Sequence, residues 1–172
     1  MDASKTCYGG LQMTKIAIYY ASLTGNNEEV AEFLATEFAR YGLKAPLTNL
    51  ESVTVDDLAA LDLAIIVPYT YGEGDLPEEG IDLFNDLEAI KLPHLIFGVA
   101  GSGDTCYGAT FCQAVNRFNA RLASTGAIQG SRPVCIDLRI EHQDCVALKG
   151  FVADLIQTLK EADTGEKAPH FN

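Results

Sequence analysis

Basic residues are scarce in this sequence, and their scarcity limits its possible partners. Only 12 residues are Lys or Arg, against 24 Asp or Glu, and the formal net charge is −12. This balance argues against nucleic acid as a partner, because its phosphates are neutralised by Lys and Arg. Residues 45–90 contain eleven Asp or Glu and no basic residue. Such an acidic stretch forms either a solvated surface or a face that steers basic partners.

Signals for membrane insertion and secretion are also absent. No apolar run approaches the roughly 20 residues that span a bilayer, and residues 1–13 lack the apolar core of a signal peptide. We therefore expect no association with a membrane. The length suits one domain with a full core. We expect a disordered leader over residues 1–13, a single domain over residues 14–162 and a flexible tail over residues 163–172.

Cysteine and histidine occur without the spacing of a metal site. The five cysteines are odd in number and form no CxxC pair, and the three histidines are scattered. The sequence therefore predicts neither a disulfide framework nor a zinc site. A reducing cytosol is the simplest setting for such cysteines, so we expect a cytoplasmic location. No nucleophile–base pair is evident, so any chemistry would belong to a bound cofactor.

Apolar runs and amphipathic segments alternate along the chain. Runs that are apolar on both faces predict the strands of a parallel sheet covered by helices on each side. We therefore predict a doubly wound α/β domain with a five-stranded parallel sheet. The predicted strands are residues 15–21, 44–50, 62–68, 95–100 and 133–138, and the predicted helices are residues 28–41, 54–61, a segment within 77–90, 110–124 and 144–162.

Three loops follow predicted strands at the edge where such sheets bind ligands. In open α/β sheets, ligands lie outside the carboxyl ends of the strands, near the point where the strand order reverses. The loops after the first, third and fourth predicted strands are rich in glycine and polar residues. They read SLTGNN (residues 22–27), PYTYGEGDLP (residues 68–77) and GSGDTCYGATFC (residues 101–112).

The first loop is suited to an anion, although it contains no Lys or Arg. Ser22, Thr24 and two asparagines supply neutral donors, and Gly25 permits a backbone conformation closed to other residues. The helix that follows would direct its free N–H groups and its dipole at the same place. The loop lacks the lysine of a Walker A motif and is not GxGxxG. Alone, it could equally be an ordinary turn capped by Asn26 or Asn27.

The other two loops carry aromatic residues beside glycines. Tyr69 and Tyr71 lie in the second loop and Tyr107 in the third. Such rings either stack on a flat ligand or pack on their own loops. The neighbouring glycines would allow the backbone to approach a ligand, and Cys112 has the character of a small buried side chain. Together, the loops predict a ligand with a phosphate-like end and a flat ring.

These three motifs resemble, in order, the [ST]xTGNT, PTWGxGxLP and GxGDxxYxxFC motifs of the flavodoxin family. The similarity runs from about residue 15 to residue 160, and the short link to the last predicted strand resembles the short-chain branch. The resemblance implies strand order 2-1-3-4-5, non-covalent FMN and one-electron transfer. From the missing lysine and the nearby acidic residues we expect a low-potential carrier that cycles between semiquinone and hydroquinone. The acidic stretch then suggests partners with basic docking faces, and we expect a monomer whose partners are a flavin-containing NADP reductase and low-potential acceptor enzymes.

The resemblance also implies roles for individual residues. The first loop would surround the phosphate, Tyr71 and Tyr107 would cover the two faces of the flavin, and the Gly72–Glu73 peptide would turn its carbonyl toward flavin N5. Backbone groups around Gly103, Asp104 and Cys112 would bind the pyrimidine edge. The cofactor-binding residues expected in this way are Ser22, Leu23, Thr24, Gly25, Asn26, Asn27, Pro68, Tyr69, Thr70, Tyr71, Gly72, Glu73, Gly74, Ser102, Gly103, Asp104, Tyr107 and Cys112.

Two residues depart from the family pattern. Asn27 stands where Thr is usual, and we expect its amide to donate to the phosphate in place of the hydroxyl. Tyr71 stands where many members have Trp, so Tyr69 could share the contact with the flavin. Alternative functions on the same fold are an FMN-dependent NAD(P)H quinone or azo reductase and a dedicated activator of one client enzyme. The missing lysine would leave the flavin in a negative environment and lower its potential.

Overall fold

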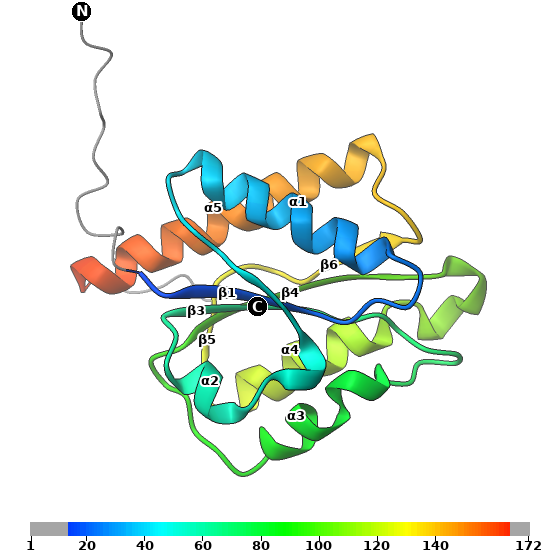
Figure 1. The fold of residues 1–172 in the computed structure, drawn as a ribbon, viewed down its shortest axis with the longest axis horizontal. Coiled ribbons are helices and arrows are strands. Elements are labelled where there is room, and N and C mark those ends of the chain that lie inside the picture. The colour runs from blue at the N-terminus through cyan, green and yellow to red at the C-terminus, as the bar shows by residue number, and fades with distance from the viewer. Residues whose placement is uncertain (1–13, 166–172) are drawn as a thin grey trace, which may run out of the picture.

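The computed structural model describes residues 14–165, which form a parallel sheet between two layers of helices (Figure 1). Helices α1 and α5 cover one face of the sheet, and α2, α3 and α4 cover the other. In chain order, the elements are β1 (Ile16–Tyr20), α1 (Asn26–Arg40), β2 (Leu47–Asn49), α2 (Val55–Ala59), β3 (Leu63–Val67), α3 (Ile81–Asp86), β4 (Ile96–Gly103), α4 (Gln113–Ser124), β5 (Ile128–Gln129), β6 (Val134–Asp137) and α5 (His142–Thr164).

The sheet has the order β2-β1-β3-β4-β5, and all of its strand pairs are parallel. This order confirms the predicted doubly wound α/β fold. The strand order reverses at β1 and β3, so the carboxyl ends of these strands open the crevice where ligands bind in such folds. The first and second predicted loops leave the sheet at this point.

The outer position beside β4 is filled by two short strands instead of the single predicted strand over residues 133–138. Strand β5 pairs with Ile96 and Phe97 at the start of β4, whereas β6 pairs with residues 100–103 at its end. Pro133 lies between the two strands, and proline cannot donate to a strand ladder. Strand β5 was not predicted because two residues are too few to form an apolar run.

Apolar residues on both faces of the central strands form two cores. All five residues of β3 are buried. The core beneath α1 and α5 includes Phe38 and Phe151, and the core beneath α2, α3 and α4 includes Phe97 and Phe118. Because helices cover both faces, the central strands β1 and β3 are apolar on both faces, as the sequence predicted, whereas the edge strand β2 has two exposed residues.

Several helix ends differ from the prediction. Helix α1 begins at Asn26, and its N-cap is Gly25 with φ 88°, so neither Asn26 nor Asn27 is the cap. Helix α4 begins only at Gln113, because its N-cap Cys112 adopts a left-handed φ of 53° and residues 105–110 before it form a separate 3-10 segment. Helix α5 continues to Thr164, two residues into the predicted tail. The predicted leader and residues 166–172 of the predicted tail lie outside the described residues.

No helix within residues 14–165 combines the length and apolar character needed to cross a membrane.

Candidate functional site

A cavity of about 240 Å³ lies at the carboxyl ends of the central strands, where the three predicted loops meet. Most of the predicted residues line it, but Gly25, Pro68, Glu73, Gly74 and Cys112 do not. One residue that was not predicted, Leu138, also forms part of the wall. The lining residues are Ser22, Leu23, Thr24, Asn26, Asn27, Tyr69, Thr70, Tyr71, Gly72, Ser102, Gly103, Asp104, Tyr107 and Leu138.

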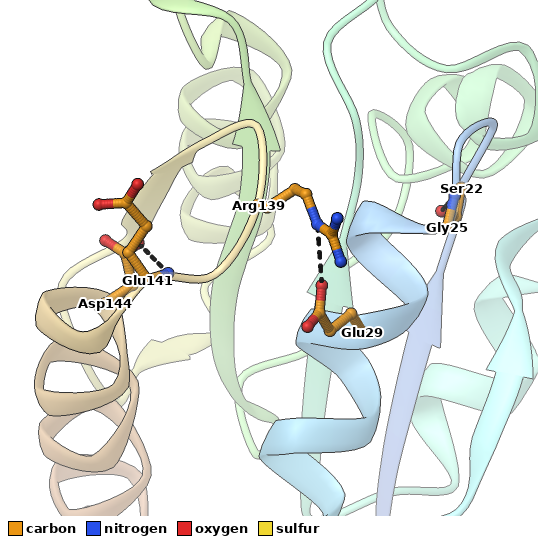
Figure 2. Close-up of polar contacts among 6 residues, drawn as sticks. All are labelled: Ser22, Gly25, Glu29, Arg139, Glu141 and Asp144. Atoms are coloured by element: carbon orange, nitrogen blue, oxygen red, sulfur yellow. Dashed lines mark hydrogen bonds and ion pairs between the residues drawn. The ribbon is translucent and has the colours of Figure 1, made fainter.

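The first loop forms a tight turn whose backbone leads directly into α1. Gly25 adopts a left-handed conformation (φ 88°, ψ −10°), which glycine accepts without steric cost. Its N–H donates to Ser22 Oγ at 3.0 Å, and both residues are drawn in Figure 2. The first N–H groups of α1 have no partner within the helix, because helix geometry leaves them unpaired. These groups and the exposed Thr24 form an uncharged turn that can bind an anion. The positive end of the α1 helix dipole also favours an anion here.

The side chain of Asn27 bonds to backbone groups of the protein at the bottom of the cavity wall. The residue is 1% exposed. Its Nδ2 donates to the Ala21 carbonyl at 3.1 Å, and its Oδ1 accepts from the Ser102 N–H at 2.8 Å. Both ends of the amide are thus engaged by buried backbone groups, and a contact between the second Nδ2 proton and a phosphate stays a prediction.

The second loop contains a small hairpin with an accessible ring. The N–H of Tyr71 donates to the Asp75 carbonyl at 2.9 Å, and the Asp75 N–H donates back at 2.8 Å. Gly72 and Gly74 allow this reversal with φ values of 49° and 109°. No hydrogen bond among the described residues engages the Gly72 carbonyl or the Glu73 N–H. Turning the peptide between Gly72 and Glu73 would therefore break no hydrogen bond among the described residues.

The three loop tyrosines divide into two kinds. Tyr71 is 60% exposed and Tyr107 is 48% exposed, so each has a free ring at the cavity. Tyr69 is half-buried against the core, and its hydroxyl donates to Glu79 Oε2 at 2.8 Å. Burial, together with this hydrogen bond, raises the pKa of Tyr69 to about 12. Tyr71 and Tyr107 are thus the candidates for stacking, and Tyr69 serves mainly to anchor its loop.

The third loop is held by hydrogen bonds to its own residues and to its neighbours. Asp104 accepts from the Cys106 N–H at 2.8 Å, and this bond lowers the pKa of the Asp104 carboxyl. Asp137 accepts from both the N–H and the hydroxyl of Thr105, at 3.0 and 2.8 Å. Thr70 receives the Ala114 N–H at 3.1 Å and so joins the second loop to the start of α4. An ionised carboxylate therefore lies beside the cavity.

Gly101 and Cys112, in the third loop, contact other parts of the protein and do not contact the cavity. A Cβ at Gly101 would collide with the Pro68 carbonyl oxygen, so this glycine permits close approach of the ends of β3 and β4. Cys112 is buried, and its Sγ lies 3.6 Å from the Gly101 carbonyl oxygen. A hydrogen bond to Cys135, and then burial, raise the pKa of the Cys112 thiol. The expectation of a small buried Cys112 side chain is confirmed.

The segment between β6 and α5 completes the cavity. Leu138 is 48% exposed and adopts a left-handed φ of 60°, and its N–H donates to the Gly103 carbonyl at 2.8 Å. Sequence reasoning missed it because Leu138 is the last residue of the predicted strand over residues 133–138, whereas β6 ends at Asp137. Its position just beyond the last strand was the available signal. The next residue, Arg139, lies 4.0 Å from Glu29 on α1 (Figure 2).

Comparison with known proteins identifies the family. The model of the family described as Flavodoxin matches residues 18–148. The chain belongs to the flavodoxin family. It is 35% identical to probable flavodoxin 1 of Bacillus subtilis (strain 168) over 146 residues, which cover 82% of this chain and 92% of that protein. A solved short-chain flavodoxin associated with a bacterial microcompartment superimposes with a TM-score of 0.83 at 35% identity, covering 86% of this chain and 99% of the other.

A longer relative contains a similar region. The sulfite reductase [NADPH] flavoprotein alpha-component of Vibrio vulnificus (strain CMCP6) is 40% identical over 116 residues, which cover 66% of this chain but only 19% of that protein. Because the family consists of FMN-binding electron carriers, this flavodoxin is an electron-transfer protein with FMN as its cofactor. Neither the alternative of an NAD(P)H reductase nor that of a dedicated activator is favoured by these relatives.

The cavity fits the cofactor chemically. A neutral turn at a helix N-terminus suits a phosphate, and two exposed rings suit a flat aromatic group. The volume of about 240 Å³ lies below the roughly 300–1,000 Å³ typical of pockets for drug-sized ligands. A flavin held here would remain partly open to solvent, as electron exchange with a partner requires. Within residues 14–165, no group of three or more His, Cys, Asp or Glu side chains could hold a metal ion.

Proposed function

We propose that this flavodoxin is a low-potential carrier of single electrons that binds FMN in the cavity between its three loops. The FMN phosphate would lie at the turn of residues 22–27, and the flavin ring would lie between Tyr71 and Tyr107. The observation that carries this proposal is that a neutral anion-binding turn and two exposed tyrosines line one cavity. Bound FMN supplies the redox chemistry, and the chain sets its environment.

The turn binds the phosphate with hydrogen bonds and without a cation. Its donors are the free N–H groups of the first turn of α1 and the Thr24 hydroxyl, whereas the Gly25 N–H is engaged by Ser22. Arg139 is paired with Glu29, and 77% of its side chain is exposed, so its charge is screened by solvent. The phosphate charge would therefore remain largely uncompensated.

The acidic groups around the ring end would lower the potential further. Asp104 lines the cavity, and its lowered pKa keeps it ionised. Glu73 and Asp75 lie on the hairpin beside Tyr71. A second electron would add negative charge to this environment, and each 1.4 kcal/mol of repulsion lowers a one-electron potential by about 59 mV.

The hairpin provides the hydrogen-bond acceptor for the first reduction step. The Gly72 carbonyl is not engaged by other described residues, whereas the neighbouring Tyr71 and Asp75 groups hold the hairpin in place. The Gly72–Glu73 peptide can therefore turn without breaking the loop. Its carbonyl would then accept a hydrogen bond from flavin N5, where the proton that accompanies the first electron is bound. This hydrogen bond would stabilise the one-electron-reduced state.

A potentiometric titration tests this function. The FMN-loaded chain is reduced stepwise while its visible spectrum is recorded. We expect two separated one-electron steps, with the second at the lower potential. A single two-electron step would contradict the proposal of a one-electron carrier.

The acidic stretch of residues 45–90 suggests the kind of partner. We propose transient docking to the basic face of a flavin-containing NADP reductase and of low-potential acceptor enzymes in the cytoplasm, with this chain as a monomer. The similarity to part of an NADPH-dependent flavoprotein supports this choice of donor. The rate of reduction by such a reductase should fall as ionic strength rises, because salt screens exposed charges. A rate independent of salt would contradict electrostatic docking.

A further inference from the structure

Asn27 connects two parts of the sheet edge that are distant in the sequence. Its buried amide donates to the carbonyl of Ala21, which directly follows β1, and accepts from the N–H of Ser102 in β4. Strand β3 lies between β1 and β4 in the sheet. The Asn27 side chain therefore spans the carboxyl end of β3 and joins its two neighbours.

These contacts also connect the two ends of the cavity. Asn27 is the second residue of α1, at the end of the anion-binding turn. Ser102 lies directly before Gly103 and Asp104, which line the ring end. The buried Ser102 N–H donates to Asn27 Oδ1 at 2.8 Å. This hydrogen bond therefore fixes the distance between the anion-binding turn and the third loop.

We propose that Asn27 is a positioning residue that sets the spacing between the phosphate turn and the ring-side loop, and that its side chain is not a phosphate ligand. This inference rests on the proposed placement of FMN. The two hydrogen bonds use one Nδ2 proton and the Oδ1 atom of the same amide, and a hydroxyl one atom shorter would not reach both groups. The departure from the usual Thr thus changes the role of this position.

The role predicts a loss of affinity that does not depend on the phosphate. The full-length chain, stripped of flavin, is titrated with FMN and with riboflavin, which lacks the phosphate. We expect Asn27→Ala to weaken both ligands by a similar factor of about ten, because the ring-side loop loses its support. We expect Thr24→Ala to weaken FMN by about tenfold and riboflavin by less than about twofold, because this residue serves only the phosphate end.

A control separates positioning from general destabilisation. Thr158 is also 1% exposed, and its hydroxyl donates to the Gly130 carbonyl at 3.2 Å, outside the cavity wall. Thr158→Val removes a comparable buried hydrogen bond and should leave both affinities within about twofold of the parent chain. Equal losses in Thr158→Val and Asn27→Ala would overturn the positioning role.

A direct measurement of the hydrogen bond needs no variant. In the labelled parent chain, a scalar coupling between the Ser102 amide nitrogen and Asn27 Cγ should be present with and without FMN. In Asn27→Ala, hydrogen exchange at the Ser102 amide should become faster by at least about tenfold. Loss of the coupling when FMN binds would show that the side chain has turned to the phosphate, and it would overturn the proposal.

The outcomes distinguish this inference from the placement of FMN. A selective loss of FMN affinity in Asn27→Ala, with riboflavin unaffected, would identify a phosphate ligand and contradict the positioning role. If Thr24→Ala left FMN affinity unchanged, the proposed phosphate site would fail instead. The Ser102 coupling and exchange rate would still decide whether Asn27 joins the two loops.

Discussion

The two ends of the cavity are built in different ways. At the end next to α1, the turn is fixed by internal hydrogen bonds, with Ser22 holding Gly25 and the buried Asn27 holding Ala21 and Ser102. At the other end, Tyr71 and Tyr107 expose 60% and 48% of their surfaces. One end thus offers fixed polar groups, and the other offers aromatic area that a ligand would cover.

This difference indicates how the two ends contribute to binding. Fixed donors at a helix N-terminus discriminate between ligands with and without a phosphate. Exposed rings bind any flavin by stacking and also leave it close to the surface. FMN and riboflavin therefore distinguish the two ends, and variants at each end should affect the two ligands differently.

The largest effect is expected where the ends of β3 and β4 meet beneath the ring end. In Gly101→Ala, the new Cβ would collide with the Pro68 carbonyl oxygen, so the backbone of one of the two strands must shift. We expect the free energy of unfolding to fall by about 3 kcal/mol, the upper end of the usual cost of overpacking. Denaturant titration measures this change. Gly150→Ala is the control, since Gly150 lies in α5 with nothing within 4 Å of the new Cβ. The control should be more stable by about 0.5–1 kcal/mol.

A smaller effect is expected from removing either exposed ring. Tyr71→Ala and Tyr107→Ala should each weaken FMN and riboflavin alike, by about 2 kcal/mol, a typical value for stacking on an aromatic side chain. Fluorescence titration of the flavin measures both affinities. Tyr69→Phe should change them little, because the Tyr69 hydroxyl is engaged by Glu79. Selective loss of FMN in either alanine variant would contradict the assignment of these rings to the flavin.

The Tyr69 anchor should also be visible at alkaline pH. The pKa of Tyr69 is raised from 10.0 to about 12, so the folded chain keeps a proton that the unfolded chain has released. The stability from this hydroxyl is complete below pH 10 and is lost between about pH 10 and 12. Tyr69→Phe should therefore show a shallower fall in the free energy of unfolding across this range. Identical pH profiles for the parent chain and the variant would contradict the anchor.

The smallest effect is expected at Arg139, the basic residue that directly follows the cavity residue Leu138. Arg139 follows Leu138 and forms an exposed pair with Glu29, a kind of contact that contributes about 0–1 kcal/mol. Arg139→Ala should leave the affinities for FMN and riboflavin within about twofold of the parent chain. A tenfold loss for FMN alone would show that this arginine neutralises the phosphate, and the description of a turn without a cation would be wrong.

The order of elements and the location of the site could be predicted from the sequence, because apolar runs and glycine-rich loops are local signals. Three features could not. The partners of Asn27 depend on Ser102, a residue 75 positions away. Leu138 reaches the cavity only because β6 pairs with the end of β4. Tyr69 differs from Tyr71 because Glu79, ten positions away, accepts a hydrogen bond from the Tyr69 hydroxyl, whereas Tyr71 stays 60% exposed.

The location of FMN in the cavity is tested most directly by amide NMR of the labelled chain with and without the cofactor. The account predicts that the large chemical-shift changes fall within residues 22–27, 69–74 and 102–107 and at Leu138. It also predicts that the changes at residues 22–27 are much smaller when riboflavin replaces FMN. Large shifts centred on another face of the sheet, or equal effects of both ligands on residues 22–27, would contradict it.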